Sequence, residues 1–305
     1  MTRAPLSAIN DGMSIPQSQF SISDKAFNGG AIADNLQALR AAGFTHLHFS
    51  HKWRTADWMT PEEIDQWQHD LQASGIAVLD VHGCHVSGVE LWDEDPEARS
   101  GAIDFFRHRL AVTKRLGGDA MVYHVPCHVE PTPQLLDRFI DSLARLEATV
   151  RDLGLVVALE NHYLLENDRR AFTAAFERFD ADYITFTLDP GHAMISGNLG
   201  WLLANCRERL RILHLNDNDG TGDHHWNPFA SDGAVDWDEI IKAIADSPYR
   251  KPIQLEVNWR PKIHGPHETF LRDAQTVARR IAADVAGQIL QVEPDSVGTG
   301  KSTVG

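Results

Sequence analysis

Cysteine is scarce in this chain of 305 residues. The three cysteines, Cys84, Cys127 and Cys206, are too few for a disulfide framework and show no CxxC spacing. We therefore expect reduced thiols and a cytoplasmic location. The first residues, MTRAPLSAINDG, lack the apolar core of a secretory signal peptide. No stretch approaches the roughly 18 apolar residues of a membrane span, so no membrane association is expected.

Positive charge is also in short supply. Lysine and arginine number 28 against 43 aspartates and glutamates, which gives a formal net charge of −15. Proteins that bind nucleic acid need a basic face for the phosphates, and an anionic membrane surface repels an acidic protein. The charge balance therefore argues against nucleic-acid and membrane partners and favours a small substrate that is neutral or weakly charged.

A glycine-rich phosphate loop is missing after the first predicted strand, which disfavours a doubly wound open sheet. Strand-like and helix-like segments instead alternate from residue 18 to residue 285, with no linker or shift in composition. One (β/α)8 barrel, a fold of about 250 residues or more, accommodates this pattern. We predict an α/β protein with a single (β/α)8 TIM barrel over 18–288, an N-terminal extension at 1–17 and a disordered tail at 289–305.

Hydrophobic periodicity gives the individual elements. The predicted strands are 18–23, 45–50, 76–82, 119–125, 155–160, 183–189, 210–216 and 252–257. The predicted helices are 31–42, 61–74, 96–117, 134–153, 169–179, 198–206, 236–246 and 267–285. Start and stop signals agree with this, namely Thr60-Pro61 with Glu63, and glycines at the expected helix ends: Gly43, Gly75, Gly118 and Gly154.

Residues that commonly bind metals close four successive predicted strands. The segments read VVALEN, ITFTLDPGH, LRILHLND and PIQLEVN, and the residues in question are Glu160, Asp189, His214 and Glu256. A single carboxylate after a strand commonly caps a helix. Four ligand-type residues at the carboxyl ends of parallel strands converge on one mouth, which predicts a metal centre. The oxygen-rich donor set favours Mn²⁺, with Mg²⁺, Co²⁺ and Zn²⁺ as alternatives.

Such a centre suits proton transfer next to a carbonyl group. A divalent ion that chelates two neighbouring oxygens of a hydroxy-carbonyl compound stabilises the enediolate formed when the adjacent C–H proton leaves. One carboxylate then serves as the base, and a second on the opposite face can return a proton. Glu160 and Glu256 are the candidates for this catalytic pair.

Several short motifs together resemble the xylose isomerase-like TIM barrel superfamily, the sugar phosphate isomerase/epimerase and endonuclease IV-like group. The motifs are LEN at 159–161, DPGH at 189–192, HLND at 214–217, DGAVDW at 232–237 and LEVN at 255–258. The resemblance covers nearly the whole chain. It implies that the four strand-end residues bind the metal, that the two glutamates are also the acid/base pair, and that His192 contacts a substrate oxygen or a second metal. The arginine that related epimerases often carry after HLND is missing from NDNDGTGDHHW.

The resemblance leaves other activities open. Some relatives act on 3-keto-glycosides, where the same enolisation is followed by β-elimination, so a lyase or deglycosidase is the main alternative. The endonuclease branch binds three zinc ions, and counterparts of its added ligands stand at His82, His124, Asp223 and His225. The acidic chain argues against that branch. A non-catalytic sugar-binding subunit is a further alternative, against which the intact set of four ligands counts.

Aromatic and imidazole side chains after the strands complete the predicted site. Tryptophans at the mouth of a barrel can stack on a sugar ring, although packing of loops is their plainer role. We predict a small carbohydrate bearing a ketone as the substrate, and homo-oligomers or a partner subunit stay open. The predicted substrate-binding residues are His192, His82, His124, Trp53, Asp223, His225 and Trp226.

Overall fold

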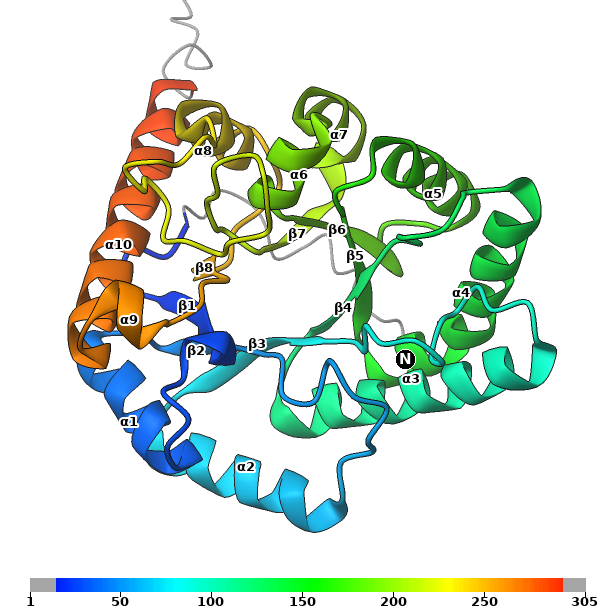
Figure 1. The fold of residues 1–305 in the computed structure, drawn as a ribbon, viewed down its shortest axis with the longest axis horizontal. Coiled ribbons are helices and arrows are strands. Elements are labelled where there is room, and N and C mark those ends of the chain that lie inside the picture. The colour runs from blue at the N-terminus through cyan, green and yellow to red at the C-terminus, as the bar shows by residue number, and fades with distance from the viewer. Residues whose placement is uncertain (1–14, 293–305) are drawn as a thin grey trace, which may run out of the picture.

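Strands and helices alternate along the chain in the computed structural model, which describes residues 15–292 (Figure 1). The strands are β1 (Phe20–Ser23), β2 (His46–Phe49), β3 (Ala77–His82), β4 (Ala120–His124), β5 (Val156–Glu160), β6 (Ile184–Leu188), β7 (Leu210–Leu213) and β8 (Ile253–Leu255). The helices are α1 (Ile32–Ala42), α2 (Pro61–Ser74), α3 (Pro96–Leu116), α4 (Pro133–Leu153), α5 (Leu165–Arg178), α6 (Pro190–Ser196), α7 (Leu199–Cys206), α8 (Trp237–Ala245), α9 (Pro261–His264) and α10 (His267–Val292), with 3-10 turns η2 (Asp24–Ala26) and η3 (Arg207–Arg209).

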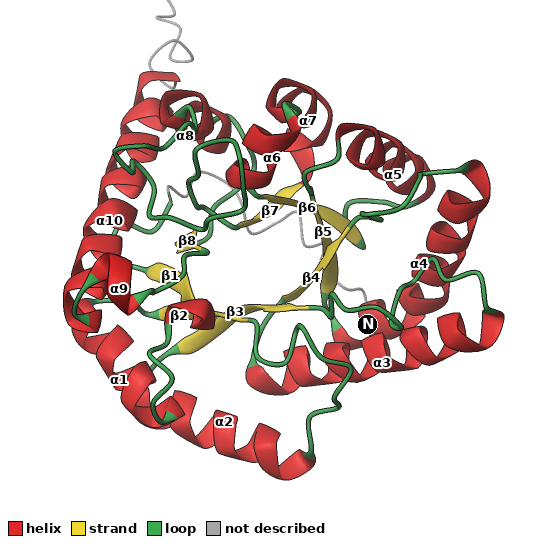
Figure 2. Ribbon diagram, in the orientation of Figure 1, coloured by secondary structure: helices red, strands yellow, loops and turns green. Residues whose placement is uncertain are grey.

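The eight strands form one parallel barrel with helices around its outside (Figure 2). Strands pair in chain order from β1 to β7, and β8 pairs with β1. A parallel bridge between Leu215 and Leu255 closes the remaining seam, with Leu215 N 3.2 Å from Gln254 O and Glu256 N 3.0 Å from Leu215 O. The predicted (β/α)8 barrel is therefore confirmed, and each observed strand lies within its predicted range.

Some helix ends agree with the ends predicted from local sequence signals, and others differ by a few residues. Thr60 and Glu63 form a reciprocal capping box at the start of α2, as the sequence predicted. The glycine that caps α3 is Gly117, with φ +90°, and not the predicted Gly118. Helix α5 begins at Leu165, four residues before the predicted 169–179 helix.

Three further segments differ from the prediction: the short helices α6 and α9 were not predicted, and α10 runs past its predicted end at 285. Helix α6 was missed because Pro190 in its first turn starts a helix directly after β6, with Asp189 as its N-cap. Helix α10 continues to Val292, beyond the predicted start of the tail at 289. Residues 1–14 and 293–305, which hold most of the predicted extension and tail, lie outside the described part of the chain. Within the described residues, no helix is both long enough and apolar enough to cross a bilayer.

Side-chain alternation along the strands divides the core into two parts. One face of β4 and β5 sends Met121, Tyr123 and Leu159 into the large cluster that the helices cover. The other face places a small cluster inside the barrel: Ala120, Val122, Ala158 and Ile212. Because alternate residues of a strand share a face, the next inward positions are His124, Glu160 and His214, at the ends of β4, β5 and β7. Strand register therefore aims these three side chains at the barrel axis.

Candidate metal centre

The four predicted ligands meet inside the carboxyl end of the barrel. Glu160, Asp189, His214 and Glu256 each offer a ligand atom, and these atoms all lie within 4.8 Å of one another. His214 Nδ1 is 3.0 Å from Glu160 Oε1 and 3.5 Å from Glu256 Oε2. All four residues are at most 1% exposed. Four segments spread over 97 positions of the sequence, from 160 to 256, thus converge on one buried point.

The donor atoms of this cluster fit a divalent cation. Glu160 Oε1, Glu256 Oε2 and both ring nitrogens of His214 are buried without an aligned hydrogen-bond partner. The other two carboxylate oxygens face Lys25 and His124 as ion pairs. Leaving buried polar atoms unsatisfied costs free energy, and charged groups cost most. Coordination by one ion would satisfy several of these atoms at once. Three carboxylates and one imidazole form a donor set suited to Mn²⁺, Mg²⁺, Co²⁺ or Zn²⁺.

Asp189 has two roles in this arrangement. Its Oδ1 accepts a hydrogen bond from the backbone N of His192 at 2.8 Å, which caps α6. Its Oδ2 accepts from Asn216 Nδ2 at 2.7 Å. Each carboxylate oxygen keeps a second lone pair, so the capping role leaves Asp189 able to bind a cation.

Electrostatic coupling among the members of this centre sets where its protons lie. Burial would raise the pKa of Glu160, but the imidazoles of His214 and His124 outweigh it and hold that pKa well below its usual value. Burial would lower the pKa of His214, but Glu160 and Glu256 outweigh it and hold that pKa well above its usual value. Burial raises the pKa of Asp189 to about 6. A bound cation must therefore displace protons from this centre.

Lys25 is a charged member of the site that is absent from the predicted residues. Its Nζ lies 2.6 Å from Glu256 Oε1 and 4.4 Å from the ring centroid of Trp53. This lysine lies two residues after the end of β1, so its position resembles that of the predicted residues at the other strand ends. It was missed because the strand-end pattern was searched for metal-binding residues and aromatic rings, and lysine is neither. Its ammonium group holds a negative charge on Glu256 and stands beside an aromatic face at the mouth.

A buried imidazole–carboxylate pair lies below the four ligands. His48 Nδ1 is 2.6 Å from Asp80 Oδ2, and His48 Nε2 is 3.5 Å from Glu256 Oε1. Both residues are completely buried. They project from within β2 and β3 and not from strand ends, so only strand register reveals their position. The pair positions Glu256 from below, as outer partners orient metal ligands in other proteins.

A polar and aromatic cavity lies next to the centre. Five of the seven predicted substrate-binding residues line this cavity, and two do not. Trp53, His124, His192, Asp223 and His225 line it, together with Lys25, Arg54, His85, His162, Tyr163 and Glu256. His82 lies deeper, with Nε2 3.4 Å from Glu160 Oε2. Trp226 is not part of the lining. Its backbone bridges to Asp217, and its ring stacks on His224 with 4.6 Å between the ring centroids.

The long loop after β7 brings Asp223 and His225 to the cavity. Asp223 Oδ2 lies 3.6 Å from His192 Nε2 and 3.1 Å from His225 Nε2. His225 also contacts Glu256 O through Nδ1 at 2.8 Å. The loop is anchored by the buried Asp217 carboxylate, which accepts from Trp237 Nε1 at 2.8 Å. Asp223 and His225, both predicted from the sequence as substrate-binding residues, therefore belong to the cavity wall.

Comparison with known proteins gives the chain its family. The family model described as "Xylose isomerase-like TIM barrel" matches residues 36–281. The chain is 26% identical over 282 residues to the uncharacterized protein y4fM of Sinorhizobium fredii. The aligned region covers 84% of this chain and 90% of that protein.

Solved structures share the fold at low sequence identity. The apo 3-keto-D-glucoside 4-epimerase YcjR from E. coli is 19% identical, with a TM-score of 0.66 and coverage of 86% of this chain and 99% of that one. An L-ribulose 3-epimerase is 15% identical, with a TM-score of 0.72 and coverage of 91% and 98%. The IOLI protein with a zinc atom is 14% identical, with a TM-score of 0.67 and coverage of 88% and 98%. The family model spans most of the sequence, and the chain therefore belongs to the xylose isomerase-like TIM barrel family.

Proposed function

We propose that this protein is a metal-dependent sugar isomerase or epimerase that transfers a proton next to a carbonyl group through an enediolate. The observation that carries this proposal is the convergence of the buried Glu160 and Glu256 carboxylates on His214 next to a polar cavity. Glu160, Asp189, His214 and Glu256 would hold one divalent cation, with Mn²⁺ the first choice. When bound, the cation supplies a Lewis acid that stabilises negative charge on the substrate oxygens.

The two glutamates are the catalytic pair in this proposal. The pKa of each is held well below its usual value, Glu160 by imidazoles and Glu256 by Lys25 and then His214, in both cases against the opposing effect of burial. Both are therefore ionised at neutral pH, as a base that removes a carbon-bound proton must be. One glutamate takes the proton and can return it to the neighbouring carbon, which gives isomerisation. For delivery to the opposite face, which gives epimerisation, the other glutamate must first take up a proton from solvent or from a substrate hydroxyl.

The substrate we propose is a small carbohydrate that bears a ketone. Trp53, His124 and His192 line the cavity, where an indole ring can pack on a sugar and His192 Nε2 can bond to a sugar hydroxyl. The ring nitrogens of His124 face Glu160 and His85. Solved structures with this fold include epimerases whose names specify L-ribulose and 3-keto-D-glucoside, which supports a ketose or a keto-glycoside.

A 3-keto-glycoside lyase is the second candidate, because the same proton removal followed by loss of the β-substituent is elimination. The likeness in fold to a 3-keto-D-glucoside epimerase favours this class over the remaining ones. An endonuclease IV-like activity is disfavoured by the net charge of −15. A non-catalytic subunit would bind metal and sugar without proton exchange. The three buried, unpaired cysteines support the cytoplasmic location predicted from the sequence.

Deuterium exchange tests the proposal directly. The Mn²⁺-loaded protein is incubated in D₂O with free ketoses or with 3-keto-glucosides, and the cation is removed before proton NMR spectra are taken. Loss of one C–H signal next to the carbonyl of a ketose, with or without a new epimer, is the expected result. Release of the aglycone from a 3-keto-glucoside would assign the lyase. Absence of exchange in protein shown to hold metal, with either class of substrate, would contradict the proposal.

Metal affinity is expected to rise with pH. The pKa of His214 is raised and that of Asp189 is about 6, so protons compete with a cation for this centre below neutral pH. Binding releases these protons, and the apparent association constant should increase roughly tenfold per pH unit for each proton displaced. Calorimetric titration with Mn²⁺ from about pH 5.5 to about pH 8, in buffers of different ionisation enthalpy, measures both quantities. An affinity that does not change with pH would contradict this assignment of protons.

A further inference from the structure

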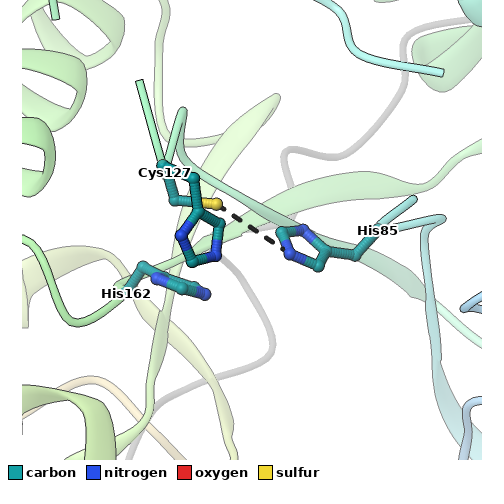
Figure 3. A group of neighbouring side chains, drawn as sticks. His85, Cys127 and His162 are labelled. Carbon is teal, nitrogen blue, oxygen red and sulfur yellow. Dashed lines mark hydrogen bonds between the residues drawn. The ribbon is translucent and has the colours of Figure 1, made fainter. Parts of the chain in front are cut away.

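A second group of metal-binding side chains lies beside the Glu160 centre. His85 follows β3, Cys127 and His128 follow β4, and His162 follows β5, so three consecutive loops contribute to it. One ligand atom from each residue lies within 4.8 Å of those of the others. The side chains of His85, Cys127 and His162 point toward one another in Figure 3.

The spacing of these side chains is close to that of a tetrahedral site. Cys127 Sγ lies 4.0 Å from His85 Nε2. With zinc–sulfur and zinc–nitrogen bonds of about 2.3 Å and about 2.0 Å, ligating sulfur and nitrogen atoms stand roughly 3.5 Å apart. The ring centroid of His162 lies 5.7 Å from that of His85 and 5.3 Å from that of His128. Small side-chain movements are therefore enough to bring the donors around one ion.

His162 supplies an independent indication that a ligand belongs here. The residue is only 3% exposed, and its Nδ1 has no hydrogen-bond partner. A buried imidazole nitrogen without a partner is costly, which calls for an explanation. The backbone of His162 is fixed, because its N donates to Asp168 Oδ1 at 2.9 Å. The ring itself packs against Tyr163, with 3.8 Å between the ring centroids.

Outer partners hold two of the other imidazoles. Tyr163 Oη lies 2.8 Å from His128 Nε2. His124 Nδ1 lies 3.2 Å from His85 Nδ1. Each of these rings keeps its other nitrogen for a cation, and outer contacts of this kind orient metal-binding histidines.

The group is chemically distinct from the Glu160 centre. None of its members is among the four predicted ligands, and its donors are one sulfur and three nitrogens in place of three carboxylates and one imidazole. His124 stands between the two, since its Nε2 is 3.0 Å from Glu160 Oε2. A site with these donors would select a different ion from the one that the oxygen-rich centre prefers.

We propose that His85, Cys127, His128 and His162 bind a zinc ion at a site separate from the Glu160 centre. One thiolate and three imidazoles match the borderline-soft character of Zn²⁺ and its tetrahedral preference. Four protein ligands leave no open position, so the ion ties together the loops after β3, β4 and β5. Because His85 and His162 also line the cavity, the zinc ion fixes one wall of the substrate site. This proposal stands whether or not the Glu160 centre acts as proposed above.

Cobalt substitution tests the site, because only a thiolate ligand gives a sulfur-to-cobalt charge-transfer band. The Glu160 centre contains no sulfur, so the band reports the second site alone. We expect it in the full chain loaded with Co²⁺, and we expect Zn²⁺ to abolish it. Cys127→Ser should remove the band and about one bound zinc per chain. Cys84→Ser is the matched control, because this neighbouring buried thiol donates to Thr55 O and should leave the band unchanged.

Further variants separate the outcomes. His128 is exposed, so His128→Ala should fold normally. Its affinity for Co²⁺ should fall on the order of 100-fold, because loss of a ligand costs at least as much as loss of a residue that orients a ligand. Glu160→Gln should retain the band. If this variant shows the band and the wild type shows no proton exchange, the second metal site stands. Only the proposed function is then contradicted. Absence of the band from the Co²⁺-saturated wild type, or its persistence in Cys127→Ser, would overturn the second site.

Discussion

Glu160→Gln is expected to lower the rate of proton exchange by about 10²–10⁴-fold, the contribution typical of a positioned acid or base. Glutamine matches glutamate in size, but its neutral amide cannot accept a proton from carbon. The same loss is expected for Glu256→Gln, because the second carboxylate must return the proton. Deuterium incorporation into the substrate, followed by NMR at saturating substrate, gives the rate for each variant.

Metal binding has to be separated from proton transfer in this experiment, because both glutamates are also predicted ligands. The rates are therefore compared at saturating Mn²⁺, with bound metal measured in each variant. Glu166→Gln is the matched control, because that side chain lies on α5 and is 59% exposed, so it should keep the wild-type rate. Wild-type rates in both Glu160→Gln and Glu256→Gln, with normal folds by circular dichroism, would rule out the proposed mechanism.

Gly233→Ala is expected to lower the free energy of unfolding by about 2–3 kcal/mol, in the range of overpacked sites. An added Cβ would lie 2.5 Å from Cγ of the Asp217 carboxylate and closer still to Oδ2. The carboxylate cannot swing away, because it accepts from Trp237 Nε1 at 2.8 Å and from Asn218 N at 2.9 Å. Urea denaturation followed by tryptophan fluorescence measures the change.

Gly287→Ala provides a control of opposite sign. This glycine lies within α10, and an added Cβ there would meet open space. Alanine favours a helix interior over glycine by roughly 0.5–1 kcal/mol, so this variant should be slightly more stable than the wild type. If Gly233→Ala unfolded at the wild-type urea concentration, the Asp217 carboxylate would be free to move. The β7–α8 loop with Asp223 would then lack the anchor described above.

Local sequence was sufficient for the barrel and for the four residues of the candidate metal centre. Apolar runs that end in Glu160, Asp189 and Glu256 mark strand ends, and parallel strands in a barrel all end at one mouth. Inward and outward faces alternate along each strand, so a strand-end position also fixes the direction of its side chain. The same local signals place Thr60 and Glu63 at the start of α2.

Tertiary structure decided what surrounds that centre. The sequence cannot show that Trp53 faces the cavity while Trp226 stacks on His224, because loop backbone conformation turns each ring. Nor can it show that His48 and Asp80 meet below Glu256, since their pairing depends on the register between β2 and β3.

The second metal-binding group shows the same limit most clearly. Cys127 and His85 are 42 positions apart, and in the sequence alone Cys127 is one of three expected reduced thiols with nothing to mark a partner. Loops lack the fixed periodicity that relates sequence position to direction in strands, so the meeting of loop side chains depends on long-range packing. The sequence by itself therefore determined the fold and the residues at its strand ends. Only the tertiary structure, by packing the loops against one another, decided which other side chains stand around them.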